Sequence, residues 1–486
     1  MIDKSKFEKL EKLYEQGINP FPNRYDKKNF AKEVVDKYSK LKDGEHTKNT
    51  VSVAGRIMTA RVMGKASFFT LQDQSGRVQL FGSKDNLKNY DLLKKLDRGD
   101  IIGVKGVVFK TKRGEVSIDV KSFDLLTKSL ANLPEKWKGL VDQELRYRKR
   151  FTDLVSNREV FEFFLKRTEF VKNIRKFMDK NGFMEVETPV LENTTGGAEA
   201  RPFITHHNTL DFDLYMRISL ELHLKRLMVG GFERVYEIGK VFRNEGMSSE
   251  HLQEFTLLEF YYGYIDYEEL MKFVQEMYQT TIQETFGTLK VKYGDEVLNF
   301  GGNWKKIDYV DIVKKETGID ILKEDTKEKL LKAIKSKSLS IDIEKFAGRG
   351  RVIDQLYKKY VRPKLIQPCF LINHPVVISP LAKKQEKNPE LTERFQILIA
   401  GSEVGNGFSE LNDPIDQRKR FEEQAALREG GDDEAQMLDE NFIEALEIGM
   451  PPTSGFGVGI DRLLMILTNQ PTIRDVVLFP TMKPGE

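Results

Sequence analysis

The chain has 486 residues, too many for one hydrophobic core, so two or three domains are expected. Its net charge of +3 neither requires nor excludes a nucleic-acid partner, and its single cysteine, Cys369, excludes an internal disulfide and a cysteine-based zinc cluster. The N-terminus lacks the apolar core of a signal peptide, and no apolar run is long enough to span a bilayer. These features predict a cytoplasmic protein without a membrane partner.

Residues 1–50 predict an N-terminal extension of charged amphipathic helices. Phe7, Leu10 and Tyr14 recur at helical spacing. Two interpretations are equally good. The helix packs on the next domain, or its lysines contact an RNA backbone.

Residues 51–128 predict a small β-barrel, for which the OB-fold is the leading candidate. Five β-rich runs are separated by turn signals such as Gln74-Ser75-Gly76. Such barrels bind single-stranded nucleic acid by stacking bases on aromatic rings. Phe68 and Gln79 fall on adjacent strands and Glu115 opens another, so the three side chains could stack on a base and read its edge. Phe68 alone would more often be a core residue, as Phe69 is expected to be.

A linker at 129–150 leads to a second domain at 151–486, in which helices and strands alternate. Residues 323–360 are rich in lysine and helical in pattern, which indicates an insertion on that domain. Cys369 lies in an apolar stretch, where a buried structural thiol is far more common than a nucleophile.

The most informative stretch begins at Phe242-Arg243-Asn244-Glu245 and runs through His251 to the segment 255–261. Alternate side chains of a strand share a face, so a strand here would place Arg243 beside Glu245 and Phe255 in line with Glu259. Charged and aromatic side chains at sites where a core would use Val or Ile indicate a bound ligand. That ligand would have an anionic part for Arg243, a flat part for Phe255 and a cationic part for Glu259. The alternative for Arg243 is an ion pair with Glu245.

Two further motifs flank this stretch. One is Gly182-Phe183-Met184-Glu185-Val186-Glu187-Thr188-Pro189-Val190-Leu191, and the other is Gly455-Phe456-Gly457-Val458-Gly459-Ile460-Asp461-Arg462 before an apolar helix. In this order and spacing, the three motifs resemble those of the class II aminoacyl-tRNA synthetases, and of the lysyl-tRNA synthetases in particular. The resemblance implies an α+β fold, in which helices flank an antiparallel sheet and an OB-fold β-barrel precedes them. It also implies a cytoplasmic homodimer, with the first motif at its interface.

The activity implied by the resemblance is ATP-dependent conversion of L-lysine to lysyl-adenylate, followed by transfer to tRNA(Lys). Arg243 and Arg462 match the family's two catalytic arginines, which suits a reaction that brings a carboxylate to a phosphate. The matching ATP-binding positions are Arg243, Glu245, His251, Phe255, Glu403 and Arg462.

The lysine pocket implied by the resemblance combines carboxylates with an aromatic wall, as an ammonium on an alkyl stem requires. Its matching positions are Gly197, Glu221, Glu259, Tyr261, Asn406, Phe408 and Glu410. For Glu221 alone, a helical ion pair with Lys225 at i,i+4 would be favoured. For Gly197, a plain turn is the default.

Magnesium is expected with ATP, and Glu403 matches one of the family's metal ligands. The other position carries Gln396 where the family has glutamate. The loop before Phe255 also departs from the family, with Glu250 and Leu252-Gln253 in place of basic or small residues and Asn-Pro. In the barrel, Phe68, Gln79 and Glu115 match positions that grip the central anticodon base.

Three alternatives to a full lysine–tRNA ligase remain. One is a paralogue that binds tRNA or ATP but aminoacylates poorly, as the departures at Gln396 and Leu252-Gln253 suggest. Another is a lysine ligase that acts on a protein, against which the N-terminal barrel argues. The third is a plain oligonucleotide-binding module, which does not explain the second domain.

Overall fold

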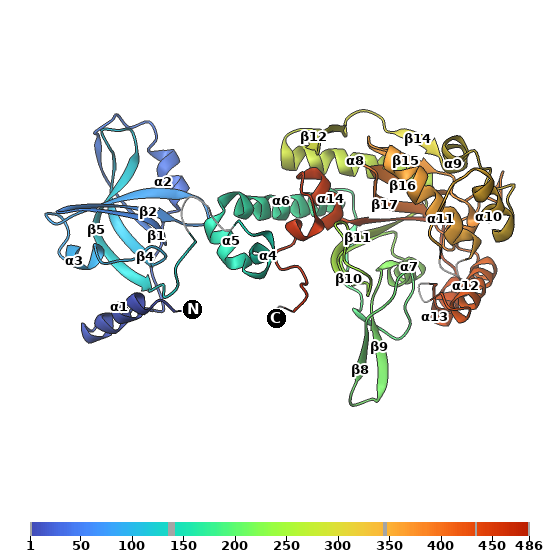
Figure 1. Cartoon of the computed structure of the whole chain (residues 1–486), viewed down its shortest axis with the longest axis horizontal. Coiled ribbons are helices and arrows are strands. Elements are labelled where there is room, and N and C mark those ends of the chain that lie inside the picture. Colours follow the sequence, from blue (N-terminus) through green and yellow to red (C-terminus); the bar gives the residue numbers. More distant parts are fainter. Residues whose placement is uncertain (1, 135–140, 344–347, 433–434, 485–486) are drawn as a thin grey trace. The chain divides into compact units, whose positions relative to one another are not determined.

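The computed structural model describes residues 2–134, 141–343, 348–432 and 435–484. The chain divides into two compact units, Met1–Val141 and Asp142–Glu486 (Figure 1). Part of the expected linker, residues 135–140, lies outside the described residues. In the described part of the chain, no helix is long and apolar enough to cross a membrane.

The first unit is built on a closed five-stranded barrel with the order β1-β2-β3-β5-β4. Its strands are β1 (His46–Met63), β2 (Ala66–Gln72), β3 (Arg77–Ser83), β4 (Ile101–Lys110) and β5 (Val116–Thr127). Phe69 is 1% exposed and forms part of the barrel core, as expected. β1 begins before the boundary expected at Val51, because His46 pairs with Phe109 of β4 and their rings stack at 4.8 Å.

Three helices accompany the barrel. They are α1 (Lys4–Glu15), α2 (Ala31–Lys37) and α3 (Tyr90–Leu93). The face of α1 expected from Phe7 and Tyr14 is wrong, because these side chains are 42% and 55% exposed. Leu10 and Leu13 are the buried apolar pair, which shifts the packed face around the helix.

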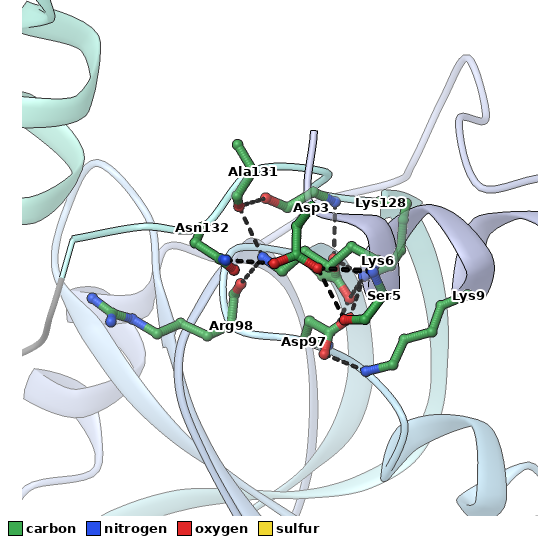
Figure 2. A network of polar contacts seen from close by, with 11 residues as sticks. Asp3, Ser5, Lys6, Lys9, Asp97, Arg98, Lys128, Ala131 and Asn132 are labelled. Atoms are coloured by element: carbon green, nitrogen blue, oxygen red, sulfur yellow. Dashed lines mark hydrogen bonds and ion pairs between the residues drawn. The ribbon is translucent and has the colours of Figure 1, made fainter. Parts of the chain in front are cut away.

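Lysines hold α1 to the barrel through the polar network in Figure 2. Lys6 Nζ donates hydrogen bonds to the backbone oxygens of Arg98 (3.2 Å) and Ala131 (2.8 Å). Lys9 Nζ lies 2.5 Å from Asp97 Oδ1, and the same carboxylate pairs with the buried Lys128 through Oδ2 (2.7 Å). Lys6 and Lys9 therefore serve packing, which favours the first of the two interpretations of this helix.

The second unit contains an eight-stranded sheet with the order β14-β15-β16-β17-β18-β11-β10-β6. Its strands are β6 (Met184–Glu185), β10 (Arg234–Phe242), β11 (Glu254–Gly263), β14 (Lys305–Asp308), β15 (Cys369–Ile372), β16 (Arg394–Ile399), β17 (Ser402–Ser409) and β18 (Thr453–Gly459). Only the outer pairs β14–β15 and β10–β6 are parallel within this sheet. The expected α+β fold, an antiparallel sheet flanked by helices after an OB-fold barrel, is confirmed.

Smaller strands form two further sheets. They are β7 (Leu191–Glu192), β8 (Ile204–His207) and β9 (Phe212–Met216), and the pair β12 (Lys290–Tyr293) and β13 (Glu296–Asn299). The β8–β9 hairpin projects from the rest of its unit in Figure 1 and exposes Ile204 and Leu210, each more than 60% accessible.

Helices cover both faces of the large sheet. The helices of this unit are α4 (Gln143–Arg148), α5 (Arg150–Ser156), α6 (Arg158–Lys180), α7 (Glu221–Val229), α8 (Tyr267–Phe286), α9 (Tyr309–Thr317), α10 (Lys327–Ser336), α11 (Arg349–Tyr360), α12 (Pro414–Glu429), α13 (Glu440–Ile448) and α14 (Ile460–Leu467). Short 3₁₀ turns occupy Arg362–Lys364, Val376–Ile378 and Ile473–Val476. Leu258 and Phe260 of β11 pack with α6, α8 and α14. Tyr261 faces the other way and packs with α7 and α13, so alternation along β11 separates the two faces.

The lysine-rich insertion expected at 323–360 is part of a larger helical group. α9 shares one apolar core with α10 and α11, through Val313, Leu330 and Leu356. This group therefore begins at Tyr309, ahead of the expected boundary. Cys369 is buried in the same core and its pKa is raised to about 12 by burial, as suits a structural thiol.

Candidate active site

A cavity of about 1080 Å³ opens on the face of the sheet that carries α7, α12 and α13. Every site residue expected in the second unit lines it. They are Gly197, Glu221, Arg243, Glu245, His251, Phe255, Glu259, Tyr261, Gln396, Glu403, Asn406, Phe408, Glu410 and Arg462. These positions come from distant parts of the chain, and the sheet brings them together.

Glu259 lies at the buried end of this cavity, on β11. Its carboxylate accepts hydrogen bonds from the Tyr261 hydroxyl (2.8 Å) and from the backbone N–H of Leu220 (3.2 Å). Burial and the nearby Glu221 carboxylate raise the pKa of Glu259 to about 8. No ion pair among the described residues includes Glu259, although the nearby charge of Lys225 acts against the rise in its pKa.

The other two glutamates of this end share a cation from the protein itself. Lys225, which is fully buried, pairs with Glu221 on the same helix and lies 2.5 Å from Glu410 Oε2. Burial opposes the charge on Lys225, but the two carboxylates outweigh it and raise its pKa. The helical pair considered for Glu221 is therefore present, although it lies inside the cavity wall and not on a solvated face.

Glycines allow the backbone to pass close to these carboxylates. Gly197 has a φ of +81°, and a Cβ there would lie 2.5 Å from Ser219 Oγ and 2.8 Å from Glu221 Cβ. A side chain at Gly455 of β18 would overlap with Glu410 Oε1 and with the ring of Tyr261. The lysine-pocket glycine expected at position 197 is thus more than a plain turn.

Arg243 follows the end of β10, so the expectation that it shares a strand face with Glu245 is wrong. The Arg243 amide still bonds Gln253 O (2.8 Å) in register with the β10–β11 ladder, but the next two amides turn away, that of Asn244 to Arg201 O (2.7 Å) and that of Glu245 to Arg243 O (2.9 Å). The guanidinium lies 5.2 Å from the centre of the Phe255 ring, and its Nε donates to Ile218 O (3.2 Å). No ion pair between Arg243 and Glu245 occurs among the described residues, which leaves the guanidinium edge directed at the cavity.

The loop between β10 and β11 holds the residues at which this chain departs from the resembled family. Leu252 is 7% exposed and packs in the main core, and Gln253 donates from its side chain to Glu245 O (3.1 Å). Glu250 accepts a hydrogen bond from Ser402 Oγ (2.7 Å). His251 bonds Ser248 Oγ through Nδ1 (2.7 Å), and burial and Arg462 lower its pKa. These substitutions therefore have partners and shape the loop.

Arg462 projects from the first turn of α14. It donates to the backbone oxygens of Glu403 (2.9 Å) and Glu250 (3.3 Å). The preceding residue, Asp461, is fully buried and accepts from the backbone N–H of Thr256 (2.7 Å) and from Arg167 (2.7 Å). Asp461 therefore anchors the start of α14 to β11 and orients Arg462 across the cavity.

Glu403 and Gln396 lie on β17 and β16, and both line the cavity. Gln396 Oε1 is 3.2 Å from Nε2 of the buried His374, whose pKa burial and Arg394 hold well below its usual value. A neutral imidazole can donate this hydrogen bond, which uses part of the amide oxygen's capacity. Among the described residues, no group of three or more His, Cys, Asp and Glu side chains could hold a metal ion. A carboxylate such as that of Glu403 suits a magnesium ion that brings its own phosphate ligands, whereas the neutral amide of Gln396 is a weaker donor to such an ion.

Some cavity residues escaped the sequence reasoning. Arg394 Nε donates to Asn406 Oδ1 (2.9 Å) and orients that amide. Strand alternation could have indicated Arg394, since it lies two residues before Gln396 on β16. His374, between β15 and β16, offered no pattern that would have identified it.

In the barrel, Phe68 and Gln79 are half-buried on the neighbouring strands β2 and β3. The Phe68 ring lies 5.1 Å from that of Phe81, and Gln79 Nε2 donates to Ser117 Oγ (2.9 Å). Glu115 is exposed and directly precedes β5, the strand that pairs with β3. The three residues therefore come from adjacent strands on the outside of the barrel.

Comparisons with known proteins agree with this architecture. Residues 142–483 match the family model described as tRNA synthetases class II (D, K and N), and residues 51–126 match the OB-fold nucleic acid binding domain. A lysine–tRNA ligase of Moorella thermoacetica is 49% identical over 483 residues, which cover 99% of this chain and 97% of the relative. One of Thermoanaerobacter pseudethanolicus is 50% identical over 98% and 95% of the two chains. The chain therefore belongs to the class II tRNA synthetases of the D, K and N group.

Proposed function

We propose that this protein is a lysine–tRNA ligase that activates L-lysine with ATP and transfers it to tRNA(Lys). The observation that carries the proposal is the charge balance at the buried end of the cavity. Three glutamates, Glu221, Glu259 and Glu410, meet one resident ammonium, that of Lys225. A lysine side chain supplies a cation to such a site, whereas aspartate or asparagine would gain nothing from it. Phe408, whose ring lies 5.3 Å from Lys225 Nζ, adds an aromatic wall for the alkyl stem.

We assign the ATP end of the cavity to the residues that precede and follow β11. The Arg243 guanidinium would meet the α-phosphate, Phe255 would stack on adenine, and Arg462 would cover its other face. Glu245, His251 and Glu403 complete this end. In the reaction, a carboxylate oxygen of lysine attacks the α-phosphorus and pyrophosphate leaves. The arginines neutralise the charge that develops, so no protein nucleophile is needed.

Magnesium would be held by Glu403 together with the phosphates of ATP, with Gln396 as a weak further ligand. Such an ion neutralises phosphate charge and favours departure of pyrophosphate. The protein's own part is to place Glu403 at the cavity wall, which the hydrogen bond from Arg462 to its backbone oxygen supports.

The remaining partners are tRNA and a second copy of the chain. We assign anticodon binding to Phe68, Gln79 and Glu115 on the outer face of the barrel. A homodimer that uses the segment 182–191 is supported by exposed apolar side chains there, since Met184 is 56% and Leu191 48% accessible. Charging of tRNA for translation supports a cytoplasmic location.

Lysine-dependent exchange of pyrophosphate into ATP tests the activation step, and transfer of labelled lysine to tRNA(Lys) tests the second. We expect both. Absence of exchange at saturating magnesium would contradict the enzyme. Exchange without transfer to tRNA would favour a ligase that acts on a protein, and exchange with very slow transfer would favour an impaired paralogue.

A further inference from the structure

Arg362 differs from the other arginine and lysine side chains that line the cavity, because it has no partner among the described residues. Arg243 and Arg462 donate to backbone oxygens, as described above. Carbonyl, amide or carboxylate oxygens likewise accept from Arg349, Arg351, Lys358, Arg394 and Arg420. The Arg362 side chain makes no hydrogen bond or ion pair in the described part of the chain, and its Nε is buried there without an acceptor. A buried donor of this kind indicates a ligand-binding group.

The turn Arg362–Lys364, which follows α11, lies close to the β10–β11 loop. A Cβ at Gly401, on the tip of the β16–β17 hairpin, would be only 3.4 Å from Pro363 Cα. The next residue on that hairpin, Ser402, donates a hydrogen bond to the Glu250 carboxylate (2.7 Å). This series of contacts links the turn to a loop that contributes a negative charge to the cavity wall.

Electrostatic effects relate Arg362 to the residues assigned to ATP. Burial and the positive charges of Arg462, Arg362 and Lys358 lower the pKa of His251. Burial and the Glu403 carboxylate raise the pKa of Tyr357, and Arg362 acts against that rise. The Arg362 charge therefore reaches two groups of the wall that also feel Arg462 and Glu403.

The charge of ATP calls for a cation of this kind. Arg243 is assigned to the α-phosphate, but most of the negative charge of ATP lies on the β- and γ-phosphates. The Glu250 carboxylate would repel these two groups. A guanidinium without a resident partner can meet phosphate oxygens with two parallel N–H groups, and no internal ion pair has to be broken first.

We propose that Arg362 binds the β- and γ-phosphates of ATP and the pyrophosphate that is released from them. This inference rests on the proposed function, because it takes ATP as the substrate of the cavity. In the activation step, a carboxylate oxygen of lysine forms a bond to the α-phosphorus. The bond from that phosphorus to the oxygen it shares with the β-phosphate breaks, and its electron pair leaves on pyrophosphate. Arg362 stabilises the charge that gathers on this leaving group.

Calorimetric binding of ATP and of AMP to Arg362→Met tests the proposal, because AMP keeps the adenine and the α-phosphate but lacks the other two phosphates. We expect the dissociation constant for ATP to rise roughly tenfold or more at constant free magnesium, and that for AMP to stay within about twofold of wild type. Lys364→Met is the matched control, since Lys364 lies on the same turn but pairs with Glu316. It should leave both constants unchanged. Equal losses for ATP and AMP in Arg362→Met would overturn the proposal.

Pyrophosphate exchange and transfer to tRNA separate the triphosphate from RNA as the phosphate that Arg362 meets. In Arg362→Met, KM for ATP and KM for pyrophosphate should both rise, whereas KM for lysine should stay at the wild-type value. Arg362→Lys, which keeps the charge but not the planar fork, should fall between the two proteins. A raised KM for tRNA(Lys) with unchanged binding of ATP would assign Arg362 to the RNA and overturn the proposal.

Chemical modification of wild-type protein keeps the test decisive even where the variants fold poorly. Phenylglyoxal reacts with arginine side chains, and peptide mass spectrometry measures the extent of reaction at Arg362. Inorganic pyrophosphate should protect Arg362, whereas AMP should not. Protection by both compounds or by neither would overturn the inference but leave the proposed function intact. Wild-type protein that bound ATP but failed to exchange pyrophosphate with lysine would instead contradict the function itself.

Discussion

At the scale of single residues, the raised pKa of Glu259 predicts that lysine binding depends on pH. Its pKa of about 8 means that the carboxyl is protonated in the free protein at neutral pH, and a neutral acid cannot pair with an ammonium. We expect the dissociation constant for lysine to decrease roughly tenfold for each unit by which pH rises toward 8, and to level off at higher pH. Calorimetry between pH 6 and 8.5 measures this, and Glu259→Gln should bind weakly with no such slope.

The same residue should lower the stability of the free protein. A carboxyl whose folded pKa exceeds its unfolded value binds more protons in the folded state, so the free energy of unfolding falls as pH rises from about 4.5 to 8. Without lysine, the Tm of wild type should therefore drop more than that of Glu259→Gln between pH 6 and 8.5. An equal drop in the two proteins would show that Glu259 is ionised throughout this range.

Gln396 is the residue whose neutral amide should weaken the proposed magnesium site. Its amide oxygen is neutral and faces His374 Nε2 at 3.2 Å, so it offers little to a divalent cation. The Gln396→Glu variant adds a second carboxylate near Glu403 and should lower the magnesium concentration needed for half-maximal pyrophosphate exchange severalfold. Direct titration with Mn²⁺, followed by its paramagnetic signal, gives a readout independent of turnover. An unchanged magnesium dependence would show that Gln396 is remote from the metal.

At the scale of elements, β18 must run beside β11 and β17 without side chains that fill the pocket. Gly455→Ala would place a methyl group against Glu410 and Tyr261. Gly457 lies two residues further along the same face, and the methyl group of Gly457→Ala would be 3.9 Å from the nearest atom of Glu259, an ordinary contact distance. We expect Gly455→Ala to cost about 1–3 kcal/mol of stability and to raise KM for lysine strongly. Gly457→Ala is the matched control and should change both far less. Chemical denaturation and pyrophosphate exchange measure the two effects, and equal effects would contradict this view of the strand.

Strand periodicity explains which parts of these elements could be predicted. Phe255, Glu259 and Tyr261 were expected on one face of a strand, and all three line the cavity. The same rule failed at Arg243, because β10 ends at Phe242 and the chain turns at Asn244 to bond Arg201. Helical spacing failed in a similar way for α1, because it could not tell that Leu10 and Leu13, and not Phe7 and Tyr14, meet the barrel. Local patterns report faces, whereas tertiary contacts decide where an element stops and which face is covered.

At the scale of the whole molecule, the family and both domains could be recognised from motifs, but the cation at the centre of the site could not. The spacing indicated Lys225 only as the i,i+4 partner of Glu221. Its burial depends on Glu410, which lies 185 residues further along the chain, and on the rings of Phe408 and Phe442. A contact of that range has no signature in spacing or composition. The sequence therefore predicts which residues gather in the site better than which of them pair with each other.

The division into two units leads to the last prediction, which separates recognition of tRNA from activation of lysine. Phe68 belongs to the barrel unit, and the residues assigned to ATP and lysine all belong to the other unit. Phe68→Ala removes a ring that can stack on a base, which is worth about 1–3 kcal/mol, so KM for tRNA(Lys) should rise roughly tenfold or more. Lysine-dependent pyrophosphate exchange without tRNA should remain at the wild-type rate. Phe7→Ala, which removes an exposed ring from α1 of the same unit, should change neither reaction. A loss of exchange in Phe68→Ala would mean that the barrel supports the active site directly.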